Sequence, residues 1–211
     1  MTDELVLYTH PMSRGRIARW MMEEIGQPYR AEIVGFGEPM KGSAYRAINP
    51  MGKVPALVHG DTIVTECAAI CAYMADAFPQ AGLAPAPGSR LRGPYYRWLF
   101  FAAGPVEAAV SNKAFGMEAP PDRARSIGYG TYADTMDMLE YAVTRGDYLA
   151  GDRFSAADVY VGSQIQWGLQ FGTIEKRPAF EAYGARISAR PAARRAAEID
   201  DALMAEMQKS A

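Results

Sequence analysis

Residues 49–77 carry the groups in this chain that are best suited to bind a small ligand. Val54 precedes Pro55, so its backbone is restricted to extended geometry next to a residue without an N–H. If the bond between them is cis, the N–H and C=O of Val54 turn outward and can pair with a ligand. Glu66 then begins a helix whose unpaired N–H groups favour an anion. With Lys53 nearby, this pattern suits a ligand that carries a peptide backbone and carboxylates.

Alternating strand and helix patterns must position these groups. Apolar runs and turn residues predict strands near residues 5–8, 29–34, 56–58 and 62–64, helices near 13–25 and 67–77, and an irregular loop over 35–48. This order predicts a small mixed sheet with helices packed on it.

The second half of the chain shows helical periodicity only. We therefore expect a first domain over residues 1–80, a Pro/Gly/Ala-rich linker over 81–90 and an all-helical domain over 91–211. Ser155 followed by Asp158 predicts a capping box at the start of one of these helices.

Composition narrows the function classes. The 211 residues have a formal net charge of −2, which argues against nucleic acid as the main partner. Two basic clusters are expected to be solvated helix faces: Arg14, Arg16 and Arg19, and Arg186, Arg190, Arg194 and Arg195. The two cysteines and two histidines suggest neither a disulfide framework nor a metal site. The start of the chain lacks a signal-peptide core and no apolar run reaches the ~18 residues of a membrane span, so we predict a cytoplasmic protein without membrane partners.

Several motifs resemble those of the cytosolic glutathione S-transferases. They are NPMGKVPAL at 49–57, the Gly-Asp and Thr-Glu pairs at 60–61 and 65–66, YMADAFP at 73–79 and YLAGDRFSAAD at 148–158. The resemblance spans nearly the whole chain. It implies an α/β thioredoxin-like N-terminal domain followed by an all-α helical bundle (the GST fold), in a bacterial-type member with a serine-type or unusual active-site turn.

The same resemblance implies that glutathione is the ligand and co-substrate. Val54 would pair its backbone with the cysteinyl part of glutathione, with Pro55 in the cis form. Glu66 would contact the γ-glutamyl ammonium group, and the N–H of Cys67 would contact the γ-glutamyl carboxylate. Here the chain departs from the family, which usually has serine after the glutamate; a thiol is only a weak donor. Lys53 and Lys41 would face the glycyl carboxylate.

The group that activates the glutathione thiol is left open by the sequence. The thiolate is the nucleophile, so the enzyme needs a donor or a positive field near sulfur. His10 and Ser13 occupy the C-x-x-C spacing of thioredoxin-like redox enzymes, which excludes dithiol chemistry at this position. Ser13 is the first choice as donor, although it also fits a plain helix N-cap. His10 is the second choice, and Arg14 or Arg16 could add positive field.

A hydrophobic electrophile is the expected second substrate, in a pocket between the domains. Its candidate lining residues are Met12, Phe101, Phe115 and Trp167, within an aromatic-rich region that also includes Tyr95, Phe100 and Val106. The sequence does not name the electrophile or choose among conjugation, peroxide reduction and isomerisation. The leading hypothesis is a homodimeric glutathione transferase. The alternatives are a non-catalytic protein of this fold that binds glutathione or a hydrophobic ligand, and a structural dimerisation domain.

Overall fold

A computed structural model describes residues 4–118 and 120–209, which form two compact units. The first unit holds residues 4–81 and 189–209, and the second holds 82–118 and 120–188. Residues 1–3, at the start of the chain where the absence of a signal peptide was inferred, and 210–211, at the end of the expected helical domain, lie outside the described residues.

A four-stranded mixed sheet forms the centre of the first unit, in the order β2-β1-β3-β4. β1 (Leu5–Thr9) pairs parallel with β2 (Arg30–Ile33) and antiparallel with β3 (Ala56–His59). β3 pairs antiparallel with β4 (Thr62–Thr65), which confirms the predicted hairpin. β1 lies between two strands, and its first three residues are buried accordingly.

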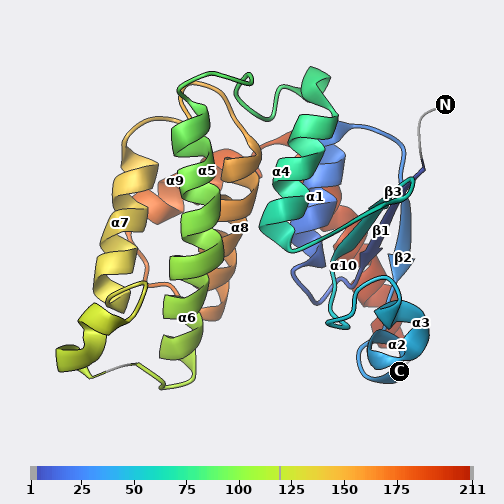
Figure 1. Ribbon diagram of the computed structural model, residues 1–211, viewed down its shortest axis with the longest axis horizontal. Coiled ribbons are helices and arrows are strands. Elements are labelled where there is room, and N and C mark those ends of the chain that lie inside the picture. Colours follow the sequence, from blue (N-terminus) through green and yellow to red (C-terminus); the bar gives the residue numbers. More distant parts are fainter. Residues whose placement is uncertain (1–3, 119, 210–211) are drawn as a thin grey trace. The chain divides into compact units, whose positions relative to one another are not determined.

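Helix α1 (Gly15–Ile25) lies against α4 (Cys67–Ala77) and α10 (Pro191–Lys209) in the first unit (Figure 1). Its predicted apolar stripe is buried at Ile17, Trp20, Met21 and Ile25. Gly26 ends the helix in the left-handed conformation, and its N–H donates to the carbonyl of Met22. The sequence pattern therefore placed this helix and its end correctly.

The segment between β2 and β3 corrects the expectation of an irregular loop. It contains two short helices, α2 (Glu38–Lys41) and α3 (Ser43–Arg46). Gly37 and Gly42 stand immediately before them as N-cap residues. Gly37 and Gly42, two of the residues that suggested an irregular loop, thus mark the helix boundaries.

The second unit is helical in its described part. Its α-helices are α5 (Arg92–Phe101), α6 (Glu107–Ala114), α7 (Tyr132–Thr144), α8 (Ala156–Phe171) and α9 (Pro178–Ser188). The predicted capping box begins α8, where buried Asp158 accepts hydrogen bonds from the N–H and hydroxyl of Ser155 at 2.9 and 2.8 Å. Asp158 also accepts from the Leu149 N–H and the Tyr183 hydroxyl. Burial raises the pKa of Asp158, and these hydrogen bonds oppose the shift. Among the described residues, no helix has an apolar run long enough to cross a membrane.

The last helix is where the domain organisation differs from the expected helical domain over 91–211. α10 belongs to the first unit, in which it contacts α1. Its buried residues are Ala192, Ala196 and Asp200, four positions apart on one helix face. Two alanines and an aspartate give little apolar signal, so periodicity alone did not reveal this face.

Candidate functional site

Three segments of the first unit meet at one edge of its sheet. Tyr8 of β1 is paired with Ala56 of β3, and Ala56 is paired with Thr65 of β4. The strands are antiparallel, so the residues after β1, before β3 and after β4 lie at the same edge. These segments are the first turn (residues 10–14), the proline loop (residues 49–55) and the start of α4. They contain most of the residues for which the sequence predicted chemistry.

The proline loop presents an unpaired backbone. The bond between Val54 and Pro55 is cis, as predicted. Within the part of the chain that the structure describes, neither the N–H nor the C=O of Val54 forms a hydrogen bond, and the residue is half-buried. An extended ligand backbone could therefore pair with Val54 as an added strand would.

Asn49 holds the proline loop in shape, a role that the sequence analysis did not assign. Its buried side chain donates to the carbonyl of Lys53 at 2.7 Å and accepts from the N–H of Met51 at 3.1 Å. The hydroxyl of Tyr45 donates to the same Lys53 carbonyl at 2.8 Å. The Asn-Pro-x-Gly sequence indicates this role of Asn49, because an asparagine side chain often forms a hydrogen bond with the backbone two residues later.

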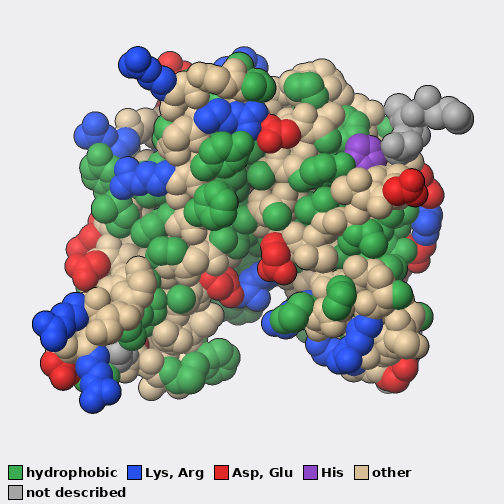
Figure 2. All heavy atoms as spheres, in the orientation of Figure 1, with side chains coloured by type: hydrophobic (Ala, Val, Ile, Leu, Met, Phe, Trp, Pro, Cys, Tyr) green, Lys and Arg blue, Asp and Glu red, His purple; other side chains and the backbone are tan. Residues whose placement is uncertain are grey.

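Gly52 is required by the geometry of the proline loop. Its φ is +56°, and a Cβ there would lie 2.7 Å from the carbonyl oxygen of Met40. The ammonium group of Lys41 crosses the same region and donates to the carbonyls of Met51 at 3.1 Å and Gly52 at 2.6 Å. An ammonium group has three donors, so one remains for a ligand. The side chain of Lys53 is exposed, and Figure 2 shows Lys and Arg side chains gathered around α2 and α3.

The start of α4 combines backbone strain with uncapped N–H groups. Glu66 has φ +66°, and it is the one non-glycine residue with positive φ in the described chain. Such a conformation costs about 1–3 kcal/mol, and it tends to occur at functional sites. Among the described residues, no side chain caps the helix, and a hydrogen bond runs from the N–H of Ile70 to the carbonyl of Glu66. The backbone N–H groups of the first helical turn, including that of Cys67, lie at the end of the helix that favours an anion.

Cys67 joins the start of α4 to the first turn. Its buried thiol donates to the carbonyl of Arg14 at 3.4 Å. The thiol is thus directed to the backbone of the turn, while the Cys67 N–H remains at the helix start. This hydrogen bond links the start of α4, the predicted anion site, to the first turn with its thiol-activating candidates.

Ser13 already uses its hydroxyl inside the first turn. The group donates to the carbonyl of His10 at 2.7 Å and accepts from the N–H of Gly15 at 3.0 Å. The N-cap of α1 is Arg14, so Ser13 bonds the backbone just before the helix and is not the N-cap that its position predicted. A ligand sulfur would compete with the carbonyl for the Ser13 proton.

His10 is 4% exposed and its ring lies 4.1 Å from that of Phe36. The N–H of Met12 donates to Nδ1 of His10 at 3.1 Å, so the proton of the neutral ring is on Nε2. Burial lowers the pKa of His10 below its ordinary value of 6.5, and the Asp200 carboxylate partly opposes that shift. At neutral pH, His10 is therefore an uncharged ring with one N–H to donate.

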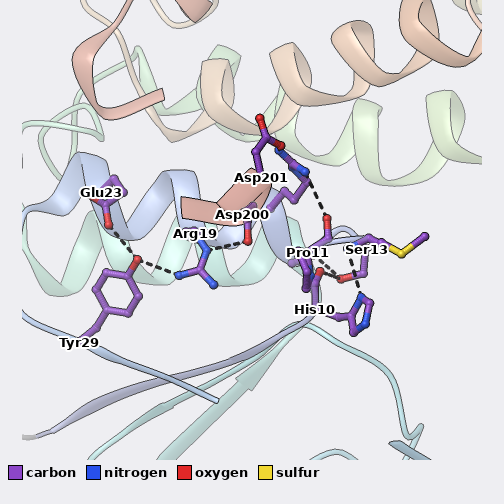
Figure 3. A network of polar contacts seen from close by, with 11 residues as sticks. His10, Pro11, Ser13, Arg19, Glu23, Tyr29, Asp200 and Asp201 are labelled. Carbon is purple, nitrogen blue, oxygen red and sulfur yellow. Dashed lines mark hydrogen bonds and ion pairs between the residues drawn. The ribbon is translucent and has the colours of Figure 1, made fainter. Parts of the chain in front are cut away.

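The expectation that Arg14, Arg16 and Arg19 form a solvated face is wrong for Arg19. Its side chain is 2% exposed, and its Nε donates to Oδ1 of Asp200 at 2.8 Å (Figure 3). Asp200 belongs to α10 and is itself fully buried. No local sequence pattern indicates this ion pair, because its members are 181 positions apart.

The predicted electrophile-binding residues are divided between the two units. In the first unit, Met12 of the first turn is exposed. In the second unit, Phe115 is exposed, while Phe101 and Trp167 are half-buried. In the neighbouring aromatic-rich region, Tyr95 and Val106 are fully buried, whereas Phe100 is exposed. Among the described residues, no group of three or more His, Cys, Asp or Glu side chains is arranged to hold a metal ion.

Comparison with known proteins identifies the family. A model of the glutathione S-transferase N-terminal domain matches residues 12–77, and one of the C-terminal domain matches residues 130–191. The glutathione S-transferase GstA of Escherichia coli O157:H7 is 31% identical over 170 residues, with 78% of this chain and 79% of that protein covered. The chain belongs to the glutathione S-transferase family. The predicted family and fold class are thereby confirmed.

Two solved structures extend the family comparison to the fold. A glutathione transferase from Methylococcus capsulatus is 29% identical, with a TM-score of 0.77 over 93% of this chain and 98% of that one. A glutathione transferase homologue from Sulfitobacter, solved with bound glutathione, is 26% identical, with a TM-score of 0.71 over 96% of this chain and 99% of that one. Both share with this chain the glutathione S-transferase fold, that is, the thioredoxin-like unit and the helical unit.

Proposed function

We propose that this protein is an active glutathione transferase, in which bound glutathione thiolate attacks a hydrophobic electrophile. In this step a carbon–sulfur bond forms, and the electron pair of the broken bond leaves with the displaced group or moves onto the substrate. The observation that carries the proposal is the meeting of the unpaired Val54 backbone, the uncapped start of α4 and the first turn at one sheet edge.

Each end of glutathione has a matching group at this edge. Val54 would pair with the cysteinyl backbone, and the Cys67 N–H would bind the γ-glutamyl carboxylate at the positive end of α4. Glu66 is exposed at the same corner and would bind the γ-glutamyl ammonium group. Lys53 and the remaining donor of Lys41 would bind the glycyl carboxylate. Opposite charges are thus offered to each charged group of the tripeptide.

Ser13 is the proposed donor to the glutathione sulfur. Rotating its hydroxyl away from the His10 carbonyl gives up one neutral hydrogen bond, worth about 1 kcal/mol. A hydrogen bond to a thiolate is charge-assisted and worth about 1.5–3 kcal/mol, so the exchange favours the thiolate. His10 is the second candidate through its Nε2–H, and its burial limits its access to a ligand.

Turnover of an activated aryl halide with glutathione tests this function. We expect Ser13→Ala to lower kcat/KM by about a hundredfold, as loss of a donor to developing charge does in other enzymes. We expect Glu66→Gln to weaken glutathione binding about tenfold in a calorimetric titration, with little change in kcat. Full activity in Ser13→Ala would assign activation to another group, and His10→Asn is then the variant to measure.

A second function has two observations in its favour. The Ser13 proton is committed to the His10 carbonyl, and the family serine after Glu66 is replaced by a cysteine that bonds backbone. A protein that holds glutathione or a hydrophobic ligand without turnover fits these contacts. Binding of glutathione at millimolar concentration, together with no turnover of aryl halides, peroxides or isomerisable substrates, would favour this alternative.

Other features of the protein stay predictions from its sequence and family. We infer a homodimer, a cytoplasmic location and a detoxification role, with Met12, Phe101, Phe115 and Trp167 at the electrophile pocket. Light scattering of the purified protein measures the oligomeric state. Substitution of Phe115 by alanine should raise KM for the electrophile and leave the affinity for glutathione unchanged.

A further inference from the structure

Two consecutive acidic residues of α10 bind two arginines of α1. Asp200 pairs with Arg19 (Figure 3), and Asp201 pairs with Arg16. The arginines are three positions apart and so lie on one face of α1. The acids are separated from them by more than 180 positions in the sequence. The C-terminal helix is therefore fastened by two ion pairs near the beginning of α1.

Arg16 extends this connection into the first turn. Its Nη2 pairs with Asp201, and its Nη1 donates to the carbonyl of Pro11 at 3.3 Å. Pro11 lies between His10 and Ser13, the two candidates for thiol activation. Ser13, Met12 and Gly15 make local hydrogen bonds in this turn, and the Cys67 thiol donates to the carbonyl of Arg14 from α4. The Asp201–Arg16–Pro11 chain adds a support from α10, at the part of the turn between His10 and Ser13.

We propose that Asp201 is a positioning residue, which acts through Arg16 on the carbonyl of Pro11 and so lets α10 set the geometry of the first turn. Without Asp201, Arg16 is free to take other rotamers, and the Pro11 carbonyl loses its fixed donor. Activation of the sulfur depends on the position of a donor in this turn, and displacements of about 1 Å can cost up to a hundredfold in rate. The kinetic consequence rests on the proposed transferase function, whereas the structural consequence does not.

A third ion pair between the same helices provides the control. Nε of Arg195 lies 3.2 Å from Oε2 of Glu23, near the C-terminal end of α1 and away from the first turn. Like the Arg16–Asp201 pair, it joins one exposed partner to one that is more covered. Arg195→Gln therefore removes a comparable link between α1 and α10 without touching Arg16 or Pro11.

The test compares Asp201→Asn, Asp201→Glu and Arg195→Gln in the full chain. Amide hydrogen exchange at the N–H groups of Met12, Ser13 and Gly15 measures how well ordered the turn is. The ultraviolet absorbance of bound glutathione thiolate, followed with pH, reads the pKa of the thiol. The side chain of Asp201 is 69% exposed, so its substitution leaves the core intact.

We expect Asp201→Asn to speed exchange at the three amides about tenfold, to raise the apparent pKa of the bound thiol, and to lower kcat about tenfold with KM within about twofold. Asp201→Glu restores these properties, and Arg195→Gln leaves them as in the wild type. Equal exchange and thiol pKa in Asp201→Asn and Arg195→Gln would overturn the inference. If the wild type does not bind glutathione, the proposed function fails, while the exchange comparison still decides whether α10 orders the turn.

Discussion

The proline loop and the first turn lie at the same edge of one sheet, but they are held in different ways. The loop is fixed by Tyr45, Asn49 and Lys41, whose partners are at most 11 positions away. The first turn has local hydrogen bonds as well, and it is also connected to α10 through Arg16 and Asp201. The site therefore combines a self-contained binding segment with a turn that depends on the last helix.

This difference predicts that glutathione binding and activation of its thiol depend on different parts of the first unit. Changes within the proline loop should weaken glutathione binding and local stability, whatever happens in α10. Changes in α10 should act on the first turn and leave binding largely intact. Variants of the loop and of the turn can test whether these effects are separate.

Gly52→Ala should have the largest effect on the loop. Alanine at φ +56°, with the Met40 carbonyl 2.7 Å from its Cβ, should cost about 3 kcal/mol of unfolding free energy and most of the glutathione affinity. Urea unfolding and calorimetry measure the two effects. Gly88→Ala is the matched control, because Gly88 also has positive φ but nothing within 4 Å of its Cβ; it should cost about 1 kcal/mol. Equal costs at both positions would show that the close approach to the Met40 carbonyl does not add to the cost at Gly52.

Asn49→Ala should follow, with a loss of about 2 kcal/mol in unfolding free energy and about a tenfold weaker affinity for glutathione. The substitution removes the donor to Lys53 and the acceptor for the Met51 N–H, both at a buried position. The pKa of the bound thiol should stay at its wild-type value, because the first turn is untouched. A shift of that pKa in Asn49→Ala would show that the two segments are coupled.

Tyr45→Phe should have a smaller effect, about 1 kcal/mol in urea unfolding. The Lys53 carbonyl loses one of its two donors and keeps the other, from Asn49. A cost equal to that of Asn49→Ala would mean that the two donors do not support the carbonyl independently. The double variant with Asn49→Ala measures this coupling directly.

The contrast between local contacts and contacts that are distant in the sequence also explains what could be predicted from the sequence. The strands, α1 and its end at Gly26, the hairpin and the Asp158 capping box all depend on residues close together in the chain, and their patterns predicted them. The proline loop was predicted for the same reason, although the role of Asn49 was missed. The pairing of Arg19 with Asp200 joins residues 181 positions apart, and no local pattern reports such a contact. α10 was expected within the helical domain, whereas the structure groups it with the first unit; its buried face of Ala192, Ala196 and Asp200 carries little apolar signal.

The pH dependence of stability should show the smallest effect. The pKa of folded His10 is below its ordinary value of 6.5, so below pH 6.5 the unfolded chain binds more protons at this residue than the folded chain does. The contribution of His10 to the unfolding free energy should be constant above that pH and should fall as the pH drops from 6.5 to the folded pKa. Urea unfolding between about pH 5 and pH 7.5 measures it, and the fall should be shallower in His10→Gln. An identical fall in both proteins would show that His10 is not held neutral by burial.

A crystal structure of the wild type with glutathione would show whether the proline loop, the start of α4 and the first turn form one glutathione site. We expect the N–H and C=O of Val54 to pair with the cysteinyl backbone, the γ-glutamyl carboxylate to lie at the Cys67 N–H, and the Ser13 hydroxyl to lie within ~3.2 Å of sulfur. Glutathione bound with its sulfur away from the first turn, or bound elsewhere than at the proline loop, would contradict this prediction.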